Sequence, residues 1–239
     1  MKKILLAVST LLIISGCIAQ QKVYNDPNAE VRIVKNFHAI RVSGGIHLYL
    51  TQGNEEALAV SASDPEYRAR IKTEVTDGVL RIYSDRSAWD FWHDMDRMKL
   101  RAYVSFKMLD ELRASSGSHV EVNGPVKSEN LVLHFSSGAN FRGSVQVSKL
   151  KVEQNSGAES EVSGSAVSCS IGASSGSSFN GFDLQTDICD ASTSSGATLR
   201  VTVNKELSAS ASSGGEIHYK GTGLIKEIST GSGGAVTRN

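Results

Sequence analysis

The sequence has no net charge, very few prolines and no apolar run long enough to cross a membrane. Its 239 residues include 25 Lys and Arg against 25 Asp and Glu. This balance gives no electrostatic reason to expect a nucleic acid partner, because phosphate-binding proteins usually carry a basic excess on one face. Only 3 residues are Pro, whereas 22 are Gly and Ser is abundant after residue 110. Hydrophobic residues make up 40% of the chain, so a folded core is feasible.

An apolar run at the N-terminus, Ile4–Ile14, follows Lys2 and Lys3. It is shorter than the ~20 residues of a membrane-spanning helix and has the length of a signal-peptide core. The next residues, Ile14-Ser15-Gly16-Cys17, resemble the lipobox of bacterial lipoproteins, which implies cleavage before Cys17 and lipid attachment to it. The alternative is ordinary secretion with an incidental Cys17. We predict a signal peptide over 1–17 and a polar tether over 18–30.

The residue after Cys17 is Ile18 rather than Asp. By resemblance to enterobacterial lipoproteins, this favours the outer membrane over the inner one. The sequence leaves open whether the protein faces the periplasm or the cell surface.

A Ser-Gly step recurs six times in the C-terminal half, and its glycines are separated by 21, 19, 19, 20 and 18 residues. Around each glycine, apolar residues fall mostly at odd offsets, which is the period-two pattern of strands with one buried face. A repeat of ~20 residues suits one coil of a β-solenoid. We therefore predict a Ser-Gly repeat solenoid over 108–239. The predicted corner residues are Ser116, Gly117, Ser137, Gly138, Ser156, Gly157, Ser175, Gly176, Ser195, Gly196, Ser213 and Gly214.

The corner serines share parity with the apolar positions, so we expect them to face inward and form a hydrogen-bonded ladder. The glycines would supply the positive φ of each bend. No histidine recurs beside the serines to act as a base, so they are not predicted to be nucleophiles.

Four residues after each glycine lies a polar position that we expect to form one outward column. Its first members, Glu121, Arg142 and Glu161, alternate in charge. Opposite charges on adjacent strands are mildly favourable, so we interpret this column as structural.

Cys169 and Cys189 occupy the same offset in consecutive coils and should be stacked inside the solenoid. A disulfide and two buried free thiols are both compatible with that position. Metal binding is not predicted, because the two thiolates lack further ligands at a matching spacing.

Residues 31–107 form a β-rich N-terminal part. Asp64 followed by Pro65 predicts one short helix over 64–71. Residues 75–83 predict a hairpin with an Asp-Gly turn, and 101–106 a further strand. The segment 42–50 echoes the later repeats and is a candidate for an additional coil.

An aromatic loop contains Trp89, Phe91, Trp92 and His93, which are our candidate binding residues. Exposed aromatic side chains stack on sugars and anchor protein interfaces. The loop could instead cap the solenoid, which needs protected ends, or contact the membrane. The acidic residues around it do not follow a calcium-binding spacing, so no metal site is predicted.

The segment from Phe37 to Gly53 resembles the opening of the auto-transporter adhesin head (GIN) domain family, found in many Bacteroidetes lipoproteins. Lys72–Tyr83, and Leu109–Leu112 with Ser115–Gly117, resemble its later pattern. The resemblance implies an all-β fold, a right-handed parallel β-helix or solenoid with coils of ~19–20 residues. It transfers no catalytic motif.

The hypothesis from sequence is a non-catalytic, lipid-anchored envelope protein, without a cofactor, that binds a glycan or an envelope protein. The alternative is a polysaccharide lyase or hydrolase that uses a solenoid face, where Glu159 and Glu161 stand two residues apart. A purely structural envelope role is a third possibility. The oligomeric state stays open.

Overall fold

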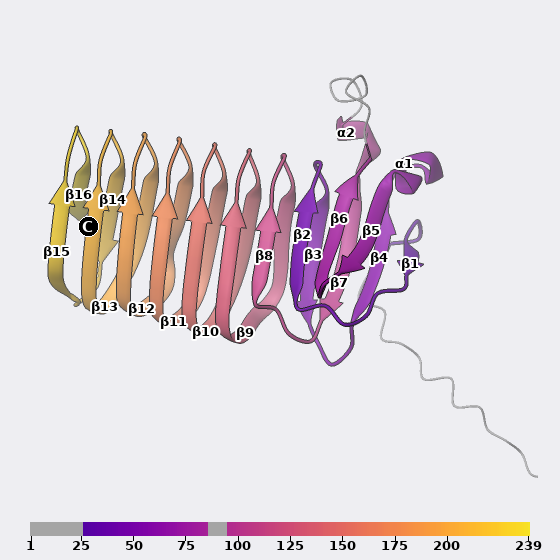
Figure 1. Cartoon of the computed structure of the whole chain (residues 1–239), viewed down its shortest axis with the longest axis horizontal. Coiled ribbons are helices and arrows are strands. Elements are labelled where there is room, and N and C mark those ends of the chain that lie inside the picture. Colours follow the sequence, from indigo (N-terminus) through magenta and orange to yellow (C-terminus); the bar gives the residue numbers. More distant parts are fainter. Residues whose placement is uncertain (1–25, 86–94) are drawn as a thin grey trace, which may run out of the picture.

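The computed structural model describes residues 26–85 and 95–239. About two thirds of the described residues lie in strands and few in helices, and parallel coils stack into a β-solenoid of about seven turns (Figure 1). The predicted fold class is therefore confirmed. The N-terminal strands are β1 (Glu30–Arg32), β2 (Ala39–Ser43), β3 (His47–Gln52), β4 (Ala57–Ser61), β5 (Ile71–Thr76), β6 (Val79–Ser84) and β7 (Arg101–Phe106). The later strands are β8 (Glu111–Ala114), β9 (His119–Phe135), β10 (Asn140–Gln154), β11 (Glu159–Ala173), β12 (Ser178–Thr193), β13 (Thr198–Ala211), β14 (Glu216–Lys220), β15 (Leu224–Thr230) and β16 (Ala235–Arg238).

Each long strand bends, so that its two ends lie on opposite faces of a flattened coil. Tight corners join the faces along one edge of the stack and rounded bends join them along the other (Figure 1). We call the strand segments that follow a corner face A and those that precede a corner face B. Face A continues through β3 and β7, and face B through β8, β2 and β6.

The core consists of columns of apolar side chains in register. On face B, Leu112 pairs with Leu133, Leu133 with Val152 and Val152 with Ile171, and all four are buried. The period-two pattern places these residues inward because successive side chains of a strand point to opposite sides. Removing apolar surface from water contributes roughly 25 cal/mol per Å², and each coil adds another layer.

The corners stack, but their serines do not face inward as we expected. Ser137 and Gly138 both have positive φ, 52° and 70°, and values within a few degrees of these recur at every predicted corner. Ser137 is exposed, and the next residue, Ala139, is the buried one. The alternation of inward and outward side chains holds on both sides of the corner, but it fails at the serine itself because that residue is left-handed rather than extended.

The ladder between corners is made by the backbone rather than by hydroxyl groups. The Gly117 amide donates to the carbonyl of Ser137, and the Gly138 amide donates to the carbonyl of Ser156. The pattern repeats through the stack as far as Gly214 and Ser232. These hydrogen bonds therefore fix the spacing of successive corners along the solenoid axis.

An additional coil precedes the six Ser-Gly repeats, as the echo in 42–50 predicted. β2 pairs in parallel with β8, and β3 pairs in parallel with β9. Gly44 and Gly45 take the two left-handed positions, and the Gly45 amide donates to the carbonyl of Ser116. The stack thus extends upstream of residue 108.

The predicted elements of the N-terminal part are present. Helix α1 (Pro65–Ala69) has Asp64 as its N-cap, and β5 and β6 form a hairpin around Asp77 and Gly78. A second helical turn, α2 (Met95–Met98), precedes β7. β7 pairs with β4, and β4 with β1, both antiparallel, which extends face A at this end.

Residues at the end of the predicted tether pack against this edge. The hydroxyl of Tyr103 donates to the carboxylate of Asp26 at 2.9 Å, and Arg68 donates to the carbonyl of Asn28 at 2.7 Å. Burial, together with this hydrogen bond, raises the pKa of Tyr103 to about 12. Residues 26–30 therefore belong to the folded edge rather than to a free tether.

Cys169 and Cys189 lie directly opposite each other on β11 and β12, and both are buried free thiols. A hydrogen bond that the Cys189 thiol donates to Cys169, together with burial, raises the pKa of Cys189 well above its ordinary value. Both features favour the protonated, unreactive form of the Cys189 thiol.

Candidate functional site

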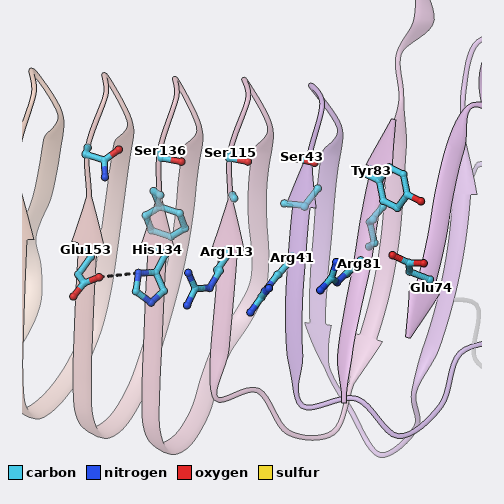
Figure 2. Close-up of a pocket in the computed structure, with 15 residues that line it drawn as sticks. Arg41, Ser43, Glu74, Arg81, Tyr83, Arg113, Ser115, His134, Ser136 and Glu153 are labelled. Atoms are coloured by element: carbon cyan, nitrogen blue, oxygen red, sulfur yellow. Dashed lines mark ion pairs between the residues drawn. The ribbon is translucent and has the colours of Figure 1, made fainter. Parts of the chain in front are cut away.

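An open groove of about 930 Å³ lies on the outer side of face B, across β6, β2, β8 and the ends of β9 and β10. Three arginines line it in a row, one from each successive strand: Arg81, Arg41 and Arg113 (Figure 2). We call these three residues the arginine row. His134 follows Arg113 on the next strand and extends the row by one position.

Parity and register together produce this alignment. Within β2, Ile40 and Val42 are buried in the core, so Arg41 between them points outward. The register of β2 places Arg41 directly opposite Arg81 on one side and Arg113 on the other. Neighbouring strands lie about 4.8 Å apart, so the row presents positive charge at that repeat along the solenoid axis.

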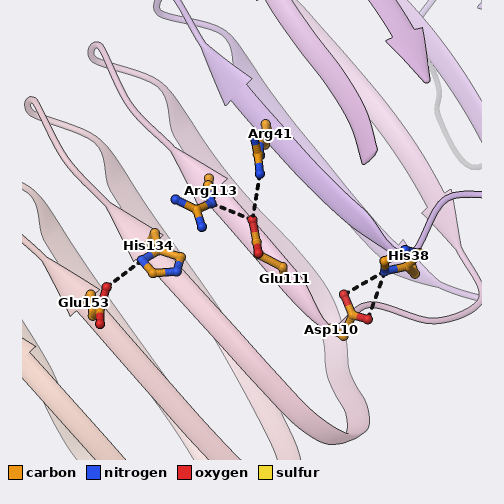
Figure 3. A network of polar contacts seen from close by, with 7 residues as sticks. All are labelled: His38, Arg41, Asp110, Glu111, Arg113, His134 and Glu153. Atoms are coloured by element: carbon orange, nitrogen blue, oxygen red, sulfur yellow. Dashed lines mark hydrogen bonds and ion pairs between the residues drawn. The ribbon is translucent and has the colours of Figure 1, made fainter. Parts of the chain in front are cut away.

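One carboxylate is shared by two members of the arginine row. Glu111 accepts a hydrogen bond from Nε of Arg113, and its Oε1 lies 3.4 Å from Nη2 of Arg41 (Figure 3). The hydrogen bond from Arg113 is the main cause that lowers the pKa of Glu111. The Glu111 carboxylate stays ionised and orients the guanidinium groups of Arg41 and Arg113. Each guanidinium group keeps further N–H donors that Glu111 does not use.

A carboxylate lies beyond each end of the line formed by the arginine row and His134. Glu153 lies opposite His134, with 3.0 Å between Nδ1 and Oε2, and Glu74 lies opposite Arg81. A hydrogen bond from Lys151 is the main cause that lowers the pKa of Glu153. Burial, followed by the charge of Arg113, lowers the pKa of His134, so this imidazole is mainly neutral near pH 7.

A second row of polar groups runs beside the arginine row, nearer to the corners. It consists of Tyr83, Ser43, Ser115, Ser136 and Asn155, and we call it the polar rim (Figure 2). Each member lies two residues beyond the charged position of the same strand, so it points to the same side. The groove therefore offers cationic groups along one line and hydroxyl or amide groups along a parallel line.

Face A carries a different arrangement. The predicted outward column is in register, and Arg142 lies between Glu121 and Glu161. Nη2 of Arg142 is 2.7 Å from Oε2 of Glu161, which supports the structural interpretation of this column. Nearer the N-terminal end, the rings of His47 and His119 stack with their centroids 4.6 Å apart.

The structure brings together residues that sequence reasoning did not select. Arg113, His134 and Glu153 each stand four residues before a corner glycine, and Arg41 stands four before Gly45. The same index that revealed the column after the corner could have revealed this one. Arg81 gives no such signal, because its hairpin has no Ser-Gly corner.

The other predicted site residues are not part of this groove. Trp89, Phe91, Trp92 and His93, like Cys17, lie outside the described residues. The corner serines line the edge of the stack. Glu159 and Glu161 lie on face A, where Glu161 pairs with Arg142. Within 26–85 and 95–239, no cluster of three or more potential metal ligands occurs, and no helix is long and apolar enough to span a bilayer.

Comparison with known proteins identifies relatives of this fold. Residues 36–223 match the family described as "Putative auto-transporter adhesin, head GIN domain". A "putative adhesin" from Bacteroides fragilis is 18% identical with a TM-score of 0.80, covering 88% of this chain and 96% of that chain. A "Putative lipid binding protein" from Parabacteroides distasonis is 21% identical with a TM-score of 0.67, covering 90% and 98%. At these identities the likeness shows a shared fold. No curated protein matches the chain.

Proposed function

Because the chain belongs to the GIN-domain family of auto-transporter adhesin heads, we propose that it is a non-catalytic binding module of the cell envelope. A lipid on Cys17 holds it at the outer membrane, and the solenoid presents a rigid surface to a glycan or to another envelope protein. Its function requires neither a cofactor nor a nucleic acid partner.

The arginine row is the observation that carries this proposal. Arg81, Arg41 and Arg113 stand on three adjacent strands whose heights are fixed by backbone hydrogen bonds. Because the strands fix the backbone of these residues before a ligand arrives, binding orders the arginine side chains but not the chain that carries them. The groove is long and open rather than a closed pocket, which suits an extended ligand.

Two carboxylates of the groove have lowered pKa values and are ionised, which supports binding rather than hydrolysis. A general acid in glycoside cleavage needs a raised pKa so that it is protonated at working pH. The pKa values of Glu111 and Glu153 are both lowered by hydrogen bonds from basic side chains. Two such carboxylates are suited to orienting cations and poorly suited to proton donation.

The binding function is tested with the purified full chain on an array of neutral and acidic glycans, with envelope extract as a second source of ligands. We expect retention of at least one glycan class or envelope protein, with no release of new reducing or unsaturated sugar ends. Cleavage of a retained glycan would support the alternative enzyme, and no retention of either ligand class would reject the proposal.

The anchor is tested by fractionating cells that produce the wild type or Cys17→Ala. The wild type should sediment with membranes, whereas the variant should be recovered in the soluble fraction. Sedimentation of both proteins would show that the lipid on Cys17 is not the anchor.

A further inference from the structure

The arginine row places like charges directly opposite one another, which a sheet ordinarily avoids. Arg41 has Arg81 on one side and Arg113 on the other. The only carboxylate that contacts the row within the described residues is Glu111, which is shared by Arg41 and Arg113. Glu74 lies opposite Arg81 in register, but no contact joins the two side chains. The three guanidinium groups therefore share a single contacting carboxylate.

Several donors of the row are unused. Arg81 is exposed and forms no hydrogen bond or ion pair with another residue of the described part of the chain. Arg41 makes one long contact, 3.4 Å between its Nη2 and Oε1 of Glu111, so its guanidinium group keeps further donors without an acceptor among the described residues. A guanidinium group binds a carboxylate through two parallel hydrogen bonds, so these donors match an anionic ligand.

The ligand must be extended and must repeat. The row offers one arginine on each of three strands that lie about 4.8 Å apart, with His134 on a fourth. The polar rim offers one hydroxyl or amide group per strand at the same repeat (Figure 2). A polyuronate carries one carboxylate and several hydroxyl groups on each sugar, so both of its recurring features have a counterpart in the groove.

We propose that this groove binds a linear acidic polysaccharide, a polymer of uronic acids, that runs along the solenoid axis. The inference rests on the proposed binding function and names its ligand class. The carboxylates of successive sugars contact Arg81, Arg41 and Arg113, and the sugar hydroxyls contact the polar rim. Glu74 and Glu153 repel further carboxylates, so they limit the bound segment to the strands between them.

The test uses the full chain with polygalacturonate and, as a matched neutral ligand, the same polymer after methyl esterification. Affinity electrophoresis or calorimetry should show binding of the acidic polymer only. The affinity should fall steeply with added salt, as expected when ion pairs dominate. Arg81→Gln, which breaks no internal contact, should weaken binding several-fold, and the triple variant R41Q/R81Q/R113Q should weaken it roughly 100-fold.

Arg200 on β13 and His218 on β14 continue the outward column of face A beyond Arg142. The control variant R142Q/R200Q removes two arginines from face A and should bind as tightly as the wild type. Circular dichroism and thermal unfolding establish that each variant is folded, and Arg81→Gln keeps the test valid should the triple variant unfold.

Three outcomes would overturn the inference. Equal binding by wild type and Arg81→Gln and by the triple variant would remove the arginine row from the site. Equal binding of the esterified polymer would leave the proposed glycan binding intact but reject the acidic ligand. Equally tight, arginine-dependent binding of anionic lipid vesicles or single-stranded DNA would make the groove a general polyanion site. Loss of all glycan and envelope-protein binding would instead count against the proposed function itself.

Discussion

The two faces of this solenoid share one backbone frame, yet they order their charges in opposite ways. On face A, Arg142 lies between Glu121 and Glu161, so adjacent strands attract each other. On face B, Arg41 lies between two other arginines. The first order is what stability alone favours, whereas the second weakens strand pairing, a cost that the proposed anionic ligand would offset. The contrast distinguishes face A, whose charges stabilise the fold, from face B, which carries the candidate site.

The largest expected loss of stability comes from a substitution in the apolar core that both faces share. Leu133 is buried between Leu112 and Val152, so Leu133→Ala should lower the free energy of unfolding by about 2–5 kcal/mol. Urea denaturation followed by circular dichroism measures this change. Val132→Ala, on the outward side of the same strand, is the matched control and should cost far less. Equal losses would contradict the assignment of inward and outward positions.

The next effect separates two roles of glycine. Gly157 lies at a corner with φ of 70°, so Gly157→Ala should cost about 1–2 kcal/mol although open space surrounds its Cβ position. Gly172 continues the charged position of face B beyond Glu153, and a Cβ there would make only ordinary contacts, the nearest at 3.5 Å from Ser192. Gly172→Ala should therefore be close to neutral. Thermal unfolding of both variants is the measurement, and a larger loss at Gly172 would refute this distinction.

The inward columns were predictable because they depend only on local alternation and on a glycine that recurs in every coil. Leu112, Leu133 and Val152 could be aligned by counting from their glycines. The direction of Ser137 could not, because counting assumes extended backbone and the corner has two residues with positive φ. Glu111 gives no sequence signal for its role, since bridging Arg41 and Arg113 depends on side-chain rotamers and on register between strands.

A smaller change in the free energy of unfolding is expected when the charge order of either face is altered. Arg142→Glu places three carboxylates in a row on face A and should lower the free energy of unfolding by about 0.2–1 kcal/mol at low salt. Arg41→Gln on face B removes like-charge neighbours and loses one long contact, so its stability should be unchanged or slightly higher. Both changes should shrink in high salt. If Arg41→Gln destabilises the protein as much as Arg142→Glu does, the arginine row contributes to stability and the contrast between the faces fails.

The smallest expected effect concerns the fourth position of the row. The pKa of His134 is lowered by burial and by Arg113, so the imidazole gains its proton only below its ordinary range near pH 6.5. The charged groups that face it are Arg113 and Glu111 from β8, and Glu153 and Lys151 from β10. Because the pKa values of both glutamates are lowered, they stay ionised while His134 titrates.

Acid should therefore act in opposite directions on the free and the bound protein. Because the folded-state pKa of His134 is lowered, its contribution to stability is present above its unfolded pKa and is lost as the pH falls through the folded value. The same protonation adds a positive charge to the groove, so the affinity for polygalacturonate should rise a few-fold between pH 7 and pH 5, where uronate carboxylates are still ionised. Calorimetric titrations of wild type, His134→Gln and the face A control His218→Gln measure this change. Only His134→Gln should lose the pH dependence, and its retention in that variant would mean that another group supplies the charge.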